Sequence, residues 1–230
     1  MVSNDIAALA EGESCEALLL TSKARVIALL RVLRQAPDDF LLLTEPELGE
    51  RVRGQLIRSR IAAKAEIELE EHRSTLVFGT RPNEAIANDD YGREAWEVLD
   101  ADVSGEELGE EELERLRIAA ARPRFGREID ERVLPAEAGL VDRAVSFTKG
   151  CYPGQEPITR LHRRGHANRS LRVLELEDGV VPELETEIRH GDKVVGRVTS
   201  AVPGLALGYV RVEVPDDAEL SIDGTEARLH

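Results

Sequence analysis

Side chains able to do chemistry gather in one segment, residues 149–156, which reads K-G-C-Y-P-G-Q-E. The segment holds an ammonium group, a thiol, a phenol, an amide and a carboxylate close together. Cys151 stands two residues after Lys149 and shortly before a short helix predicted over residues 155–161. A neighbouring cation and a helix N-terminus both lower the pKa of a thiol. Cys151 is therefore a candidate functional thiol, and the alternative is an inert small residue in a tight turn.

A basic stretch follows this segment. Residues 160–172 hold five arginines and no acidic residue: Arg160, Arg163, Arg164, Arg169 and Arg172. Guanidinium groups bind carboxylates and phosphates bidentately, so the stretch is a candidate site for an anionic ligand. The alternative is a solvated face that neutralises nearby glutamates.

Two other candidates for chemistry are set aside. His162 and His166 have the spacing of metal ligands on one helical face, but Gly165 and the flanking arginines disfavour the helix and a bound cation. Acidic neighbours raise the pKa of Cys15, which we expect to be structural. We therefore predict no metal site.

Composition excludes several functional classes. The 230 residues carry 30 Lys+Arg and 45 Asp+Glu, a net charge of −15, which disfavours direct nucleic-acid binding. We see no apolar run long enough to span a membrane and no secretory signal. The two cysteines form no disulfide framework, so we expect a cytoplasmic, reducing environment and no membrane partner.

The elements that must position these residues change in type along the chain. Three short apolar runs separated by breaks predict a meander of strands over residues 17–21, 25–33 and 40–43. From Pro46, apolar residues recur every fourth position at Leu48, Val52 and Leu56, which indicates a helix.

The middle of the chain reads less regularly. Alternation over residues 66–70 predicts a strand with one wet face, and residues 76–78 its neighbour. We expect a loop over residues 80–91, an acidic amphipathic helix over 106–117 and an irregular crossing over 122–140.

The C-terminal part predicts a small antiparallel β domain. Short apolar runs alternate with turn residues such as Gly191-Asp192 and Asp223-Gly224, without a helical window, which favours a small barrel or sandwich. A domain boundary near residue 165 follows. The predicted domains are residues 1–165 and 166–230, and the fold class is α+β.

The segment at residues 149–156 resembles the K-G-C-Y-x-G-Q-E signature of the YgfZ-type folate-binding proteins, relatives of the glycine-cleavage T-protein (aminomethyltransferase). The resemblance continues through Arg160, Gly165 and Arg169. Upstream, residues 116–126 resemble the R-x-E-A-G-I-P-x-x-G segment of both families, and residues 2–5 the end of a Q-G-x-V-T-N-D segment. The resemblance covers nearly the whole chain.

This resemblance implies a T-protein-like folate-binding domain of antiparallel sheets with helices, followed by a C-terminal antiparallel β-barrel. Since the chain begins at the V-T-N-D-like segment, we expect the strand or two that precede it in the family to be absent. The implied function is binding of tetrahydrofolate, or another reduced folate, and support of iron–sulfur cluster assembly or repair in client proteins.

The resemblance also suggests residue roles. Cys151, as the reactive thiol, and Lys149 would be the catalytic residues. The residues that contact the folate would be Arg117, Tyr152, Gln155, Glu156, Arg160 and Asp5. Asp5 is the nearest match to the catalytic aspartate of the T-protein. Two alternatives stay open: a folate-dependent aminomethyltransferase-like one-carbon transferase, and a scaffold in which the signature is only a rigid turn.

Overall fold

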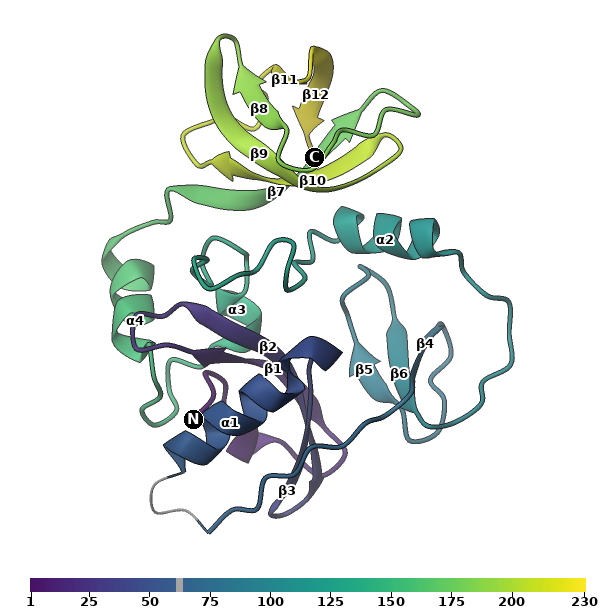
Figure 1. Ribbon diagram of the computed structural model, residues 1–230, viewed down its shortest axis with the longest axis vertical. Helices are drawn as coiled ribbons and strands as arrows, with labels where there is room; N and C mark the ends of the chain where they lie inside the picture. The colour runs from purple at the N-terminus through teal and green to yellow at the C-terminus, as the bar shows by residue number, and fades with distance from the viewer. Residues whose placement is uncertain (61–63) are drawn as a thin grey trace.

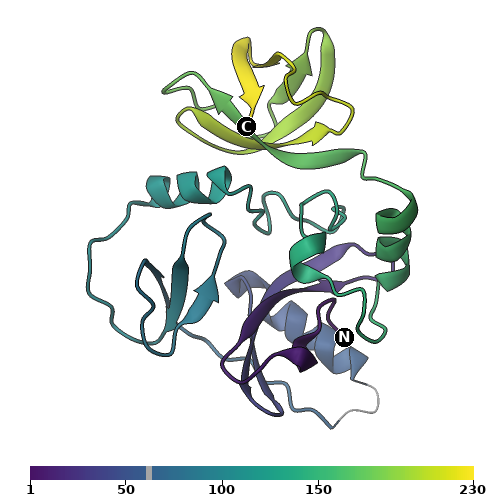
Figure 2. The same ribbon diagram turned by 180° about the vertical axis from the view of Figure 1, so that it is seen from behind.

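The computed structural model describes residues 1–60 and 64–230, and it places two small sheets below a β-barrel (Figure 1). Three helices lie between the sheets and the barrel, as the reverse view also shows (Figure 2). Both the α+β class and the barrel predicted from the sequence are confirmed. Within the described residues, no helix combines the length and apolar character required to cross a membrane.

The first sheet confirms the predicted meander. Its strands are β1 (Ser14–Leu20), β2 (Val26–Ala36) and β3 (Asp39–Leu43), in that order and antiparallel. Short 3-10 helices, η1 (Ile6–Ala8) and η2 (Pro46–Leu48), flank it. Helix α1 (Gly49–Ser59) buries Val52 and Leu56 against Ala17 and Leu19 of β1, as its fourfold spacing predicts.

The second sheet has the order β4–β6–β5, with bounds β4 (Ser74–Phe78), β5 (Ile86–Asn88) and β6 (Ala95–Leu99). The predicted strand over residues 66–70 is wrong, because this stretch pairs with no strand and Leu69 is 46% exposed. The Ile67 carbonyl instead accepts from Arg53 Nε at 3.3 Å. Strand β5 lies inside the expected loop over residues 80–91.

Three helices form the middle layer: α2 (Glu110–Ala119), α3 (Val141–Ala144) and α4 (Gln155–Arg164). Helix α2 begins four residues later than predicted, at a run of glutamates that suits a helix N-terminus. Gly154 precedes α4 with φ 84°, and a Cβ there would lie 2.8 Å from the Thr21 carbonyl oxygen. The signature segment is thereby packed against the turn between β1 and β2.

Six strands close the barrel in the order β10–β7–β12–β11–β8–β9. Their bounds are β7 (Arg169–Leu176), β8 (Glu187–His190), β9 (Lys193–Val202), β10 (Leu205–Arg211), β11 (Leu220–Ile222) and β12 (Thr225–Leu229). Gly196 and Gly208 allow the close approach of β9 and β10, since a Cβ on either would lie within 2.6 Å of a backbone oxygen across the pair.

One apolar cluster joins the barrel to the rest of the chain. Leu18 of β1, Ile118 of α2 and Ile158 of α4 pack in it together with Leu207 and Tyr209 of β10. A separate cluster fills the barrel, and a third lies between the first sheet and α1. Burying apolar area between these units fixes their relative position.

Candidate functional site

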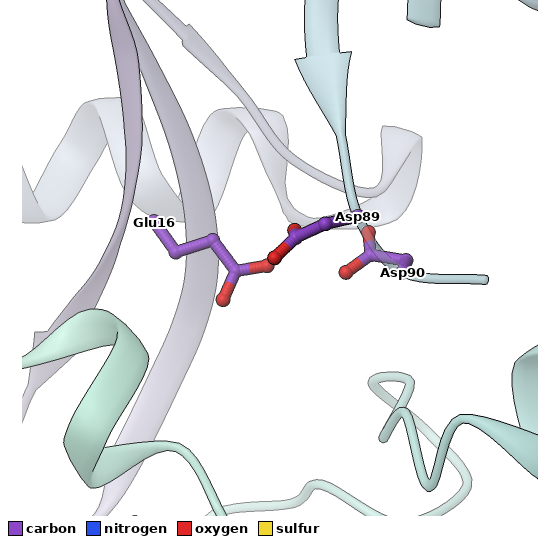
Figure 3. Close-up of side chains that lie close together, drawn as sticks. All are labelled: Glu16, Asp89 and Asp90. Atoms are coloured by element: carbon purple, nitrogen blue, oxygen red, sulfur yellow. The ribbon is translucent and has the colours of Figure 1, made fainter. Parts of the chain in front are cut away.

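Three carboxylates and three guanidinium groups meet where β1, the end of β5 and α3 come together. We call this set the charged cluster, and it comprises Glu16, Arg31, Asp89, Asp90, Arg122 and Arg143. Figure 3 shows the three carboxylates turned toward one another, Glu16 from β1 and the two aspartates from the chain after β5. Their oxygens lie within 4.8 Å of one another.

Arginines hold these carboxylates together. Arg143 Nη2 donates to Glu16 Oε1 at 2.6 Å and to Asp89 Oδ1 at 2.8 Å. Arg31 Nη2 donates to Asp90 Oδ2 at 2.6 Å. The three acids thus face three arginines, and Glu97 Oε2 lies a further 3.7 Å from Arg31 Nε.

Glu16 is the most perturbed acid of the cluster. It is only 8% exposed, on the face of β1 that Leu18 and Leu20 also occupy. Burial raises the pKa of its carboxyl to about 7, and Asp90 adds to the rise. Its Oε2 atom and Arg143 Nη1 are buried without a hydrogen-bond partner among the described residues. Such orphaned polar atoms are costly unless something else pairs with them.

The signature segment supports the charged cluster through the N-terminal residues. Lys149 Nζ donates to the carbonyl oxygens of Val2, at 2.9 Å, and Asn4, at 2.8 Å. The Asn4 side chain in turn donates to the backbone carbonyls of Glu16, at 2.7 Å, and Arg143, at 3.2 Å. Partial burial lowers the pKa of Lys149. Lys149 is therefore linked to the cluster by two hydrogen bonds through Asn4, and its predicted catalytic role stays a prediction.

Arg117 has a structural role. Its five N–H donors are all used: two on Glu114 (2.9 and 2.6 Å), and one each on Glu128 (3.0 Å), Ser200 (2.8 Å) and the Arg122 carbonyl. Ser200 belongs to β9, so this network ties α2 to the barrel. All five donors of Arg117 thus have partners among the described residues, and the folate contact that its motif implies stays a prediction.

Two open cavities flank these groups. The barrel cavity, about 830 Å³, lies between α2 and the barrel, and its lining includes Tyr91, Glu114, Arg117, Arg124, Arg127 and Leu184. The α4 pocket, about 800 Å³, lies against α4, and its lining includes Lys23, Leu134, Asp142, Ile158, Arg160 and Arg164. Both fall within the size range of small-molecule sites.

Comparison with known proteins identifies this architecture. Residues 142–230 match the family model of the CAF17 C-terminal β-barrel domain. The glycine cleavage system aminomethyltransferase T of Bartonella henselae superposes on 100% of this chain and 78% of its own, with TM-score 0.84 and 18% identity. The chain has the T-protein fold, and its C-terminal part matches the CAF17 β-barrel domain. The resemblance read from residues 149–156 is thereby confirmed.

Other relatives match part or most of this chain in sequence. An uncharacterized protein of Haemophilus influenzae is 23% identical over 95% of this chain and 81% of its own length. The Alkaliphilus oremlandii aminomethyltransferase is 32% identical over 48% of this chain. A putative chloroplastic transferase of Arabidopsis thaliana is 34% identical over 45%. These last two matches span only 29% and 25% of the relatives' own lengths.

The structure places the predicted site residues in different surroundings. The Cys151 thiol is exposed, whereas Tyr152 is buried in the cluster that joins barrel and sheets, with its hydroxyl lacking a partner among the described residues. Gln155 and Glu156 begin α4, and Arg160, farther along that helix, lines the α4 pocket. Asp5 lies beside Lys149 and Cys15 rather than in the charged cluster.

Sequence reasoning missed the charged cluster itself. Glu16 is a lone acid in the apolar run S-C-E-A-L-L-L, at the same strand parity as Leu18 and Leu20. An acid at an inward-facing strand position signals a buried partner. Asp89 and Asp90 follow a short strand, which is also where ligand-binding groups gather. Those two signals were present in the sequence.

Proposed function

We propose that this chain binds a reduced folate, tetrahydrofolate being the first candidate, at the charged cluster. The observation that supports this best is the pair of orphaned buried atoms, Glu16 Oε2 and Arg143 Nη1. A folate's pterin ring carries donors and acceptors along one flat edge, which can pair with a carboxyl and a guanidinium group together. With a pKa near 7, Glu16 can accept or donate a hydrogen bond at neutral pH.

The neighbouring barrel cavity suits the rest of such a ligand. Tyr91 follows Asp90 directly in the chain and lines this cavity, so the cavity adjoins the cluster. Arg124 and Arg127 line it too, and neither forms a salt bridge within residues 1–60 and 64–230. The glutamate tail of a folate carries carboxylates, which free guanidinium groups bind well. The residues present therefore fit a folate.

Titration calorimetry with tetrahydrofolate under anaerobic conditions tests this proposal. Glu16→Gln and Arg143→Met should each weaken binding by roughly tenfold or more, since charged hydrogen bonds contribute about 1.5–3 kcal/mol. Arg228→Met serves as the matched control, because Arg228 pairs with Glu226 on the barrel surface, outside both cavities. The proposal fails if no binding is measured at about 1 mM ligand, or if the cluster variants bind as tightly as the control.

We further propose that the folate-bound protein supports iron–sulfur client proteins, with Cys151 as the contacting thiol. The support is the signature itself and the exposure of this thiol, which stands between the tied Lys149 and the buried Tyr152. Both cysteines are free thiols, in keeping with a reducing cytoplasm. In cells lacking the protein, Cys151→Ala should fail to restore an iron–sulfur enzyme that Cys15→Ala restores. Equal rescue by both variants would remove the thiol from the function.

Aminomethyl transfer is the second candidate, favoured by the partial matches to proteins named aminomethyltransferase. It would use the same folate site, with a carboxylate beside the folate to move a proton. A turnover assay with an aminomethyl donor and tetrahydrofolate separates the two. Product formation that Asp90→Asn abolishes would favour the transferase, and binding without turnover the iron–sulfur role.

A further inference from the structure

A second pocket, the α4 pocket, lies on the other side of α3 from the charged cluster. Arg143 of α3 contacts Glu16, whereas Val141 and Asp142, its neighbours on the same short helix, line the α4 pocket. The pocket has its own lining from α4, the segment after it, the β1–β2 turn and residues 134–139. None of the six residues of the charged cluster belongs to it. The α4 pocket is therefore distinct from the folate site proposed above.

The α4 pocket concentrates positive charge in an acidic protein. Lys23, Arg160 and Arg164 line it against one acid, Asp142, while the chain as a whole has a net charge of −15. Arg160 and Arg164 are four residues apart on α4, so they stand on the same helical face. Within the described residues, none of these three cations forms a salt bridge or a side-chain hydrogen bond. Unpaired cations on a concave surface attract an anion.

Apolar side chains make up much of the pocket lining. Ile158 and Leu161 of α4, together with Leu134, Pro135 and Val141, supply aliphatic surface, which we call the aliphatic floor. His162, also in the lining, is stacked on Phe147 with ring centroids 4.4 Å apart, which adds a flat aromatic wall. Apolar walls with a few convergent charges are typical of sites for amphipathic small molecules.

We propose that the α4 pocket binds a small organic anion, with an apolar ring body on the aliphatic floor and a phosphate or carboxylate head on Arg160 and Arg164. The volume of about 800 Å³ accommodates a molecule of drug-like size. A guanidinium group pairs with either kind of anionic oxygen, so the shared chemistry is a ring bearing an anionic head.

Calorimetry with 1-naphthyl phosphate and 1-naphthoate tests the site on the full chain. At least one of these probes should bind with a dissociation constant below about 1 mM. The probe that binds more tightly shows whether the site prefers a phosphate or a carboxylate head. 1-Naphthol, which lacks the charge, and inorganic phosphate, which lacks the ring, should each bind at least about tenfold more weakly.

Variants on α4 supply matched comparisons. Arg160→Ala/Arg164→Ala should weaken probe binding by about tenfold or more, whereas Arg163→Ala should not, because Arg163 lies on the same helix outside the pocket lining. Thermal melts establish that all variants are folded. Glu16→Gln should keep probe affinity, so a failed folate site and a failed α4 pocket are told apart. Binding of neither probe, or equal affinity for the double variant and Arg163→Ala, overturns the proposal.

Discussion

Removing Arg117 should destabilise the junction between α2 and the barrel more than any surface arginine does. Its partner Glu128 is 1% exposed and also accepts from Ser200 Oγ at 2.6 Å and from the Arg124 backbone N–H at 3.0 Å. Arg117→Met leaves this buried carboxylate without the only cation that pairs with it among the described residues. Breaking a buried pair in this way costs about 3–5 kcal/mol. For a chain of this size, each kcal/mol lowers Tm by roughly 2–4 °C, so a fall of roughly 6–20 °C is expected.

Urea denaturation and thermal melting measure this loss, with Arg228→Met as the control. The Arg228–Glu226 pair has a similar 2.7 Å separation, but its side chains are 74% and 63% exposed, so its loss should cost about 0–1 kcal/mol. The double variant Arg117→Met/Glu128→Gln should lose at least about 1 kcal/mol less free energy of unfolding than the sum of the two single variants, because it leaves no unpaired buried charge. If Arg117→Met costs no more than Arg228→Met, or the two losses simply add, the buried-pair reasoning is refuted.

Three further predictions concern other parts of the chain. The pKa of Glu16 is about 7 in the folded protein and 4.5 for an ordinary glutamate, so the free energy of unfolding should fall as the pH rises from 4.5 to 7. Glu16→Gln lacks this titration. In urea melts, its free energy of unfolding relative to that of the wild type should therefore rise by roughly 1–3 kcal/mol between pH 4.5 and 7. Gly154→Ala should lower the free energy of unfolding by roughly 2 kcal/mol, because φ is 84° and the Thr21 oxygen is close, whereas Gly150→Ala, with open space, should change it by less than about 0.5 kcal/mol; equal melting temperatures would contradict this. A thiol reagent should label Cys151 rapidly in the native protein and Cys15 slowly, because Cys151 is exposed while burial and Glu16 raise the pKa of Cys15; mass spectrometry of the labelled sites checks it.

The sequence predicted local structure well where the spacing of apolar residues followed one pattern over the whole element. The meander β1–β3, helix α1 and the barrel strands all follow from apolar runs bounded by turn residues, because each of these signals acts over a few neighbouring positions. Residues 66–70 show the limit. Their alternation satisfies a strand pattern, but β4 pairs with β6, and no described strand lies beside residues 66–70 to complete a ladder.

The candidate site could be predicted only in part for a related reason. The signature residues are contiguous, so their types and spacing were visible at once. The residues of the charged cluster are not contiguous. Glu16 and Arg143 are 127 positions apart, and Lys149 is linked to them through Asn4. Such contacts depend on how whole elements pack, which residue spacing does not encode. The same holds for Arg117, whose motif suggested a ligand but whose donors are taken by tertiary partners.

The basic stretch at residues 160–172 shows how packing gives different roles to residues that look alike in sequence. Arg169 pairs with Glu137 at 3.0 Å and lies over the Tyr209 ring, and Arg172 pairs with Asp216 at 2.8 Å, both from strand β7. Arg160 and Arg164 lie on α4 and form no salt bridge with any residue that the structure describes. The positive potential at the α4 pocket therefore rests on two arginines and Lys23 within a protein of opposite charge. Since salt screens exposed charges over about 10 Å at 0.1 M, probe affinity there should fall with added salt, while the apolar floor keeps part of it.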